Sequence, residues 1–123
     1  MAKKILIVED DTFLQGLSAT KLSKEGYEVV TASNVDEAMK AIDAGAPDFV
    51  LLDLVLPGTD GYGILKKIRD GAKTAKTPVI IFSNLAEDKD IKKAKDLGAN
   101  DFMIKSNFTL DELAEKITEM IGK

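Results

Sequence analysis

The stretch ILIVEDD, residues 5–11, runs from four apolar residues directly into three acids. A short, fully apolar run is typical of a strand that is buried on both faces of a parallel sheet. Adjacent carboxylates at the end of such a strand repel each other by about 4 kcal/mol per pair at an effective dielectric of 20. The stretch therefore predicts a central strand whose end either opens into water or holds a cation between its acids.

The same alternation of a short apolar run and an amphipathic segment continues along the chain. The runs that predict strands are 4–8, 28–32, 49–52, 79–82 and 102–104. The segments in which apolar residues have helical spacing are 12–25, 35–44, 64–68, 88–97 and 110–121.

Capping and turn residues separate these segments. The candidate helix caps are Thr12 with Gln15, Asn34, and Thr109 with Glu112. The segment PGTDG at 57–61 has the composition of a loop.

Five strands that alternate with five helices predict an α/β domain with a parallel sheet. Chains of this pattern most often take the strand order 2-1-3-4-5, which gives a flavodoxin-like (βα)5 three-layer sandwich with helices on both faces. The carboxyl ends of all five strands then lie along one edge of the sheet. We expect residues 1–123 to form this single domain, with no output domain in the chain.

The composition excludes several classes of function. The chain has neither cysteine nor histidine, so it has no disulfide, no thiolate nucleophile and no phosphohistidine of its own. Its net charge is −4, with 21 acidic and 17 basic residues, whereas nucleic acid binding needs a basic face. We therefore expect no direct nucleic acid partner. No apolar run is long enough for a signal peptide or a bilayer span, so we expect no membrane contact and a cytoplasmic location.

Polar residues follow four of the five predicted strands: Glu9 and Asp10 the first, Asp53 the third, Ser83 the fourth and Lys105 the fifth. Three carboxylates at one sheet edge fit a hard divalent cation, most simply Mg²⁺, with Mn²⁺ as an alternative. An ammonium and a hydroxyl beside them suit a phosphate oxygen. Asp53 is then the natural nucleophile, because carboxylates form aspartyl-phosphates.

Each of these residues also has a simpler explanation when it is taken alone. Acids at a strand end can simply begin the next helix, where the helix dipole favours them, and Asp11 fits that role. Asp53 or Ser83 could cap a turn or a helix, and Lys105 could be a solvated lysine. Their coincidence at one predicted sheet edge favours a common site.

Four segments in register resemble the receiver domain of bacterial two-component response regulators: ILIVEDD (5–11), LLDLVLPGTDG (51–61), VIIFS (79–83) and DFMIK (101–105). The resemblance covers essentially the whole chain. It implies that Asp53 accepts a phosphoryl group, in a Mg²⁺-dependent reaction, from a phosphohistidine of a histidine kinase or a histidine phosphotransfer protein. It also implies a phosphoacceptor switch that catalyses only its own phosphorylation and dephosphorylation. The absence of histidine agrees with a donor on another protein.

The resemblance further implies which residues hold the metal. Asp10 and Asp53 bind it directly, together with the backbone carbonyl of Val55. Glu9 acts largely through water.

For the phosphate and the switch, the resemblance implies roles for three residues. Lys105 pairs with the phosphate, Ser83 hydrogen-bonds to it and moves toward it, and Phe102 turns inward when Ser83 moves. An aromatic residue at this place is as often part of the core as part of a switch. The expected output is a population shift of the surface formed by the fourth helix, the fifth strand and the fifth helix, which signals to a downstream protein of unknown identity.

The chain departs from the family pattern near the predicted site. Ser106 stands where the family usually has proline, often after a cis bond. Because a cis bond before serine costs about 3–4 kcal/mol, we predict a trans bond and a differently shaped loop at 105–108. Asn84 replaces the usual alanine or glycine, and we expect its larger side chain to narrow the access of phosphodonors. Val55 and Leu85 are apolar, and in the family the residues at these two positions affect the attack of water on the phosphoryl group. We therefore predict slow self-dephosphorylation.

Three other classes of function compete with a phosphoacceptor switch. A hydrolase with an aspartate nucleophile needs a second acid two residues further on, where this chain has Val55. A flavodoxin-like nucleotide binder needs a first loop rich in serine, threonine and glycine, whereas the first loop here is acidic and repels phosphate. A receiver-like binding module that is never phosphorylated commonly loses the acid pair, the aspartate or the lysine, and this chain keeps all of them.

Overall fold

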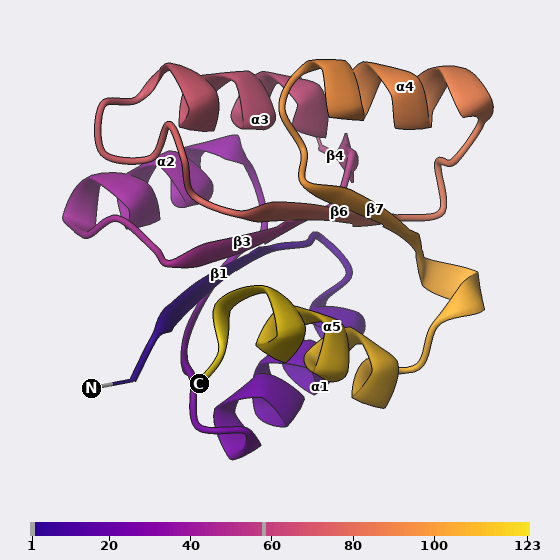
Figure 1. Ribbon diagram of the computed structural model, residues 1–123. Coiled ribbons are helices and arrows are strands. Elements are labelled where there is room, and N and C mark those ends of the chain that lie inside the picture. Colours follow the sequence, from indigo (N-terminus) through magenta and orange to yellow (C-terminus); the bar gives the residue numbers. More distant parts are fainter. Residues whose placement is uncertain (1, 58) are drawn as a thin grey trace.

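The computed structural model, which describes residues 2–57 and 59–123, places the five predicted strands in one parallel sheet (Figure 1). The strands are β1 (Lys4–Val8), β2 (Glu28–Ala32), β3 (Phe49–Leu52), β6 (Val79–Ser83) and β7 (Asp101–Ile104). Their order is β2-β1-β3-β6-β7, so the predicted order 2-1-3-4-5 is confirmed. β1 and β3 lie inside the sheet because nearly all their residues are apolar and buried, as a strand covered on both faces requires.

Helices cover both faces of this sheet. α1 (Thr12–Lys24) and α5 (Leu110–Ile121) lie on one face, and α2 (Val35–Ala44), α3 (Gly61–Asp70) and α4 (Asp88–Asp96) lie on the other (Figure 1). This arrangement is the predicted three-layer sandwich. Among the helices of the described residues, none is long and apolar enough to cross a membrane.

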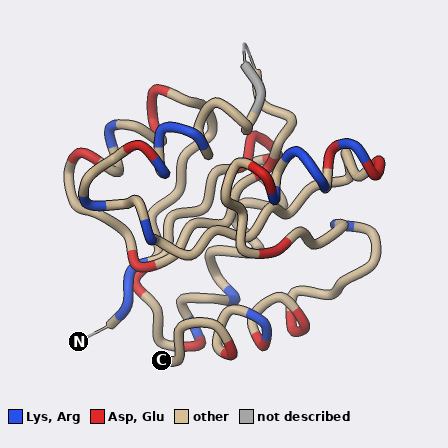
Figure 2. The backbone as a smooth tube through the Cα atoms, turned by 45° about the horizontal axis from the view of Figure 1, so that its top comes forward, with Lys and Arg blue, Asp and Glu red and all other residues tan. Residues whose placement is uncertain are grey.

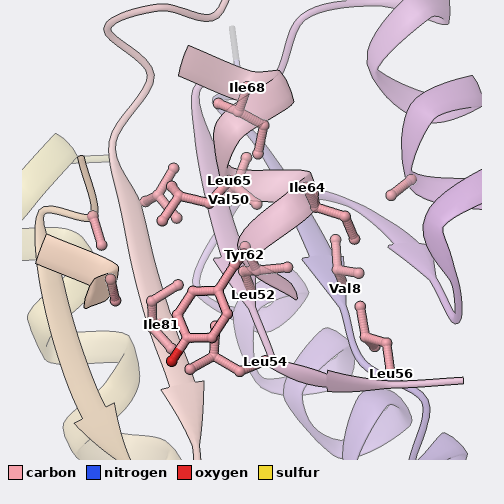
Figure 3. Packing of buried hydrophobic residues seen from close by; sticks show 14 of the residues in the cluster. Val8, Val50, Leu52, Leu54, Leu56, Tyr62, Ile64, Leu65, Ile68 and Ile81 are labelled. Atoms are coloured by element: carbon pink, nitrogen blue, oxygen red, sulfur yellow. The ribbon is translucent and has the colours of Figure 1, made fainter. Parts of the chain in front are cut away.

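Two hydrophobic clusters, one on each face of the sheet, hold the three layers together. Successive strand residues point to opposite faces, so β1 contributes to both clusters. Ile5 and Ile7 pack in the cluster beneath α1 and α5. Leu6 and Val8 pack in the cluster beneath α2, α3 and α4, which Figure 3 shows from close by. The sheet is therefore packed on both faces, and its carboxyl edge remains free to carry the site.

The predicted helix caps are confirmed for α2 and α5 and wrong for α1. Asn34 caps α2 by accepting the N–H three residues further on at 2.9 Å. Thr109 and Glu112 form the reciprocal capping box of α5. At α1 the cap is Asp11 instead of Thr12, because Thr12 is already the first helical residue. The Asp11 carboxylate accepts the backbone N–H of Leu14 at 3.1 Å. Asp11 thus has the helix-start role that the sequence offered for it.

The structure also differs from the expected loop at 57–61. Part of this segment belongs to a small antiparallel pair of strands, β4 (Val55–Leu56) and β5 (Thr59–Asp60), and α3 begins at Gly61. Residue 58 lies outside the described residues. Strands of two residues are too short to produce an alternating pattern, which explains why the sequence shows only turn chemistry here.

After β7, the chain forms the short 3-10 helix η1 (Lys105–Asn107). No cis peptide bond occurs among the described residues, so the predicted trans bond before Ser106 is confirmed.

α4 is weakly apolar and is stabilised at its ends by charge. Asp88 and Asp90 lie in its first turn, and Lys93 and Lys95 lie in its last turn. This distribution complements the helix dipole. Figure 2 shows the resulting mixture of both signs along α4.

Candidate functional site

The carboxyl ends of β1 and β3 bring three acids together, which we call the acid cluster: Glu9, Asp10 and Asp53. The strands pair in register up to Val8 and Leu52, so the residues that follow them lie side by side. One carboxylate oxygen from each acid lies within 4.8 Å of those from the other two. Glu9 and Asp53 are buried, with 4% and 5% exposure, and Asp10 is exposed. Such a cluster needs a positive counter-charge.

Lys105, at the beginning of η1, supplies part of this counter-charge. Its Nζ lies 2.7 Å from Oδ2 of Asp53 and also pairs with the carboxylate of Glu9. Burial by itself would lower the pKa of Lys105, but the hydrogen bonds that its ammonium donates to Asp53 and Glu9 outweigh burial and raise the pKa. One ammonium cannot neutralise three carboxylates, so the site retains an excess of negative charge.

Asp53 is held in its ionised form. Burial would raise its pKa, but hydrogen bonds with the side chains of Glu9 and Lys105 and with a backbone N–H lower the pKa below the ordinary value. That N–H belongs to Val55 and donates to Oδ1 at 3.1 Å. The backbone of Gly61 packs closely against the Asp53 carbonyl, so a side chain at position 61 would collide with that oxygen. Both carboxylate oxygens are therefore fixed in place, and the ionised carboxylate is the nucleophilic form.

Glu9 behaves differently from Asp53 although the two are neighbours. Burial, followed by its hydrogen bond with Asp53, raises the pKa of Glu9 to about 7, and Lys105 opposes this rise. Two carboxyl groups that share one site titrate apart, because ionising both costs repulsion. Near neutral pH, and with no cation bound, Glu9 is the member of the pair that takes up a proton.

Ser83 lies on β6, which pairs with β3, and Phe102 lies on β7, one strand further from the acid cluster. Ser83 is fully buried at the end of β6, and its hydroxyl oxygen accepts the N–H of Leu85 at 3.2 Å. The hydroxyl keeps its own proton for donation to an anion. Phe102 of β7 is half-buried and packs against the cluster beneath α2, α3 and α4. The movement expected of both side chains stays a prediction.

Residues 5–118 of the chain match the family model of the response regulator receiver domain. The chain belongs to this family. It is a receiver domain of the kind found in two-component response regulators.

Among curated relatives of this receiver domain, the transcriptional regulatory protein KdpE of Staphylococcus aureus is 40% identical over 117 residues, which are 95% of this chain and 49% of that protein. The alkaline phosphatase synthesis transcriptional regulatory protein PhoP of Bacillus subtilis is 35% identical over 105 residues, which are 85% of this chain and 43% of that protein. The chain thus spans about half the length of the curated relatives that it matches.

Solved structures agree with the family assignment. The phosphorylated cyanobacterial phytochrome response regulator RcpA superposes with a TM-score of 0.87 at 31% identity, over 98% of this chain and 94% of that one. The BeF3-activated N-terminal receiver domain of RstA from Klebsiella pneumoniae superposes with a TM-score of 0.87 at 29% identity, over 98% of this chain and 99% of that one.

The acid cluster of this receiver domain fits the Mg²⁺ that receiver domains use at an acidic pocket. Mg²⁺ prefers oxygen ligands, usually one or two carboxylates together with several waters. Asp10 and Asp53 offer such carboxylates from two adjacent strands. Glu9 pairs with Lys105, and its expected action through water stays a prediction. The part played by the Val55 carbonyl stays a prediction.

Two contacts near the site are not visible in the sequence. The side-chain amide of Gln15, expected in a capping box, instead donates to the carbonyls of Glu9 and Ala32 at 2.8 and 3.2 Å and ties the ends of β1 and β2 together. Oδ1 of Asn84 accepts the backbone N–H of Ser106 at 3.1 Å. Both contacts join different elements, so no local pattern indicates them.

Proposed function

We propose that this receiver domain is the phosphoacceptor switch of a two-component phosphorelay and that Asp53 takes up the phosphoryl group. The observation that carries the proposal is the environment of Asp53. It is a buried, ionised carboxylate 2.7 Å from the Lys105 ammonium and within 4.8 Å of two further acids. A structural ion pair needs only one acid and one base, whereas phosphoryl transfer needs acids for a divalent cation as well.

In the proposed reaction, an oxygen of Asp53 forms a bond to phosphorus while the bond between phosphorus and the donor nitrogen breaks. The proposed donor is a phosphohistidine of a histidine kinase or a histidine phosphotransfer protein, and it lies on another protein because this chain has no histidine. The imidazole leaves with the bonding electron pair as a neutral ring, since its other nitrogen carries a proton. With a small acyl phosphate as donor, a carboxylate leaves instead.

Lys105 and Ser83 are proposed to stabilise the charge on the phosphoryl oxygens. The Lys105 ammonium already lies at Asp53, so it contacts the new oxygens as a point charge without a large movement. The hydroxyl proton of Ser83 is available to a phosphoryl oxygen. When bound by Asp10 and Asp53 with the carbonyl of Val55, Mg²⁺ or Mn²⁺ would neutralise further charge as a Lewis acid.

The domain is proposed to catalyse only its own phosphorylation and dephosphorylation. Val55 and Leu85 follow Asp53 and Ser83 by two residues and are 56% and 39% exposed. Neither apolar side chain can hold a water molecule by a hydrogen bond. We therefore expect slow self-dephosphorylation of the aspartyl-phosphate.

The output is proposed to be a population shift of the surface formed by α4, β7 and α5 toward a state that a downstream protein recognises. Ser83 precedes the loop into α4, and Phe102 of β7 packs against the cluster that includes Ala94 of α4, so we expect a movement of either side chain to reach this surface. KdpE and PhoP are named as transcriptional regulatory proteins, and this chain covers about half of each. We propose that the domain itself acts in the cytoplasm through protein contacts, without touching nucleic acid or membrane, in keeping with its net charge of −4.

Incubation with Mg²⁺ and a small acyl phosphate, followed by measurement of the intact mass, tests this proposal. We expect the wild type to gain the mass of one phosphoryl group and Asp53→Asn to gain none. Asp43→Asn, which changes an exposed aspartate of α2, is the matched control and should react like the wild type. An unmodified wild type, or a modified Asp53→Asn, would contradict the proposal.

A further inference from the structure

A hydrogen bond joins the loops that follow β6 and β7, next to the proposed phosphoacceptor site. Oδ1 of Asn84 accepts the backbone N–H of Ser106 at 3.1 Å. Asn84 comes directly after Ser83, and Ser106 comes directly after Lys105. The bond therefore connects the immediate neighbours of the two side chains that are proposed to contact the phosphoryl group.

This bond continues the pairing of β6 and β7 beyond the end of the strands. The paired residues end with Ser83 opposite Ile104, and the chain then enters the loop before α4 on one side and η1 on the other. An N–H in the first turn of a helix has no acceptor within that helix, and the Asn84 side chain supplies one to Ser106. The two loops are thus held together at a point where the sheet no longer holds them.

The bond depends on the residue type at both positions. A proline at 106 would have no N–H to donate, and an alanine or glycine at 84 would have no side-chain acceptor. Proline at 106 and a small residue at 84 are the types that the receiver pattern usually has. Asn84 and Ser106 therefore depart from that pattern together, and the structure shows that the two departures contact each other.

We propose that the Asn84–Ser106 bond is a brace that fixes the separation of Ser83 and Lys105 and so prepares both for the phosphoryl group; this inference rests on the proposed phosphoacceptor function. The Ser83 hydroxyl is held by a backbone N–H of its own loop at 3.2 Å, and the Lys105 ammonium is held by the acid cluster. The Ser83 hydroxyl is thus fixed within its own loop and the Lys105 ammonium by acids that follow β1 and β3, and the brace fixes the two loops that carry these groups to each other. Groups that are already in position lose less freedom on binding.

Asn84 is the positioning residue in this proposal, acting on the backbone N–H at position 106, and its effect differs from that of side-chain size alone. Asn84→Ala removes both the acceptor and the bulk, whereas Asn84→Leu removes the acceptor and keeps the bulk. If the brace acts as proposed, the two variants lose affinity for the phosphoryl analogue to the same extent. Ser106→Ala removes a side chain but keeps the backbone N–H, so it is the matched control that leaves the brace intact.

The test measures two quantities: the apparent affinity for beryllofluoride, an analogue of the phosphoryl group, at saturating Mg²⁺, and the hydrogen exchange of the amide at position 106. For Asn84→Ala and Asn84→Leu we expect the affinity to fall about three- to tenfold, the range for one hydrogen bond, and the amide to exchange faster. Ser106→Ala should match the wild type in both measurements. A merely structural role would change the melting temperature without changing the affinity.

The possible results separate the brace from the function on which it rests. Equal affinity in the wild type and in both Asn84 variants would overturn the brace. Tighter binding by Asn84→Ala, with Asn84→Leu unchanged, would also overturn it, because Asn84 would then be an access barrier. If the wild type failed to bind beryllofluoride at all, the proposed phosphoacceptor function would fall, and the brace with it.

Discussion

At the scale of single residues, Glu9 is the acid whose surroundings change its chemistry most. Burial, and then its hydrogen bond with Asp53, raises the pKa of Glu9 from 4.5 to about 7. Between these pH values the folded protein holds a proton that the unfolded chain has released. The contribution of Glu9 to the free energy of unfolding is thus complete below about pH 4.5 and is lost as the pH rises through 7.

We therefore expect the free energy of unfolding of chelator-treated protein to fall by about 2–3 kcal/mol between about pH 5 and about pH 7.5. Glu9→Gln, which cannot titrate, should show a flatter profile. The chain has no histidine or cysteine, so few other groups titrate in this range. Urea unfolding at several pH values measures the effect. Parallel profiles for wild type and Glu9→Gln would show that Glu9 keeps an ordinary pKa.

At the scale of secondary-structure elements, α3 and α4 are joined near their N-terminal ends by a buried contact. The hydroxyl of Tyr62 in α3 donates to Oδ1 of Asp90 in α4 at 3.0 Å, and both residues are 8% exposed. Oδ2 of Asp90 accepts the N–H of Glu87 at 3.2 Å within the capping box of α4. The Lys93 ammonium lies 4.2 Å from the centroid of the Tyr62 ring. α4, which is part of the proposed output surface, is thereby attached to α3, the helix that follows Asp53 along the chain.

We expect Tyr62→Phe to lower the free energy of unfolding by about 1–3 kcal/mol, because it takes a partner from a buried carboxylate oxygen. Urea unfolding provides the measurement. A double-mutant cycle with Asp90→Ala, which removes the acceptor, isolates the pair, and the double variant should lose less than the sum of the two single losses. Additive losses would mean that the two side chains stabilise the fold independently.

The strands and the residues at their ends could be predicted from the sequence because a buried parallel strand needs an unbroken apolar run. The residue that ends such a run must then lie at the sheet edge, and Asp53 and Ser83 were located in this way. The cap at Thr109 was predictable because its partner is three residues away. The cap of α1 was not, because Asp11 and Thr12 are adjacent and either type can cap a helix.

Contacts between elements could not be predicted in the same way. The bonds of Gln15 to β1 and β2, of Asn84 to Ser106, and of Tyr62 to Asp90 depend on the distance between side chains after folding. A single sequence holds no periodic signal for such pairs. The sequence alone shows that residues 84 and 106 each depart from the receiver pattern, but only the fold shows that the two residues form a hydrogen bond with each other.

At the scale of the whole molecule, the two ends of the sheet are built differently. At the end opposite the acid cluster, Arg69 donates to the carbonyls of Thr77 and Gly98 at 2.6 and 2.8 Å and to Oδ1 of Asn100 at 2.9 Å. The same Asn100 oxygen accepts the N–H of Val79 at 2.9 Å. This end joins loops through a cation surrounded by neutral acceptors. The carboxyl end instead keeps an excess of acids, which favours it as the place of chemistry.

Direct identification of the modified residue tests the phosphoacceptor proposal most sharply. The protein is phosphorylated with Mg²⁺ and a small acyl phosphate, treated with borohydride to reduce the acyl phosphate to an alcohol, digested with trypsin and analysed by tandem mass spectrometry. We predict that the reduced residue is Asp53, within the tryptic peptide 41–66. Reduction at Asp10 or at an acid of peptide 41–66 other than Asp53, or a phosphoryl group that resists borohydride, would contradict the assignment of Asp53.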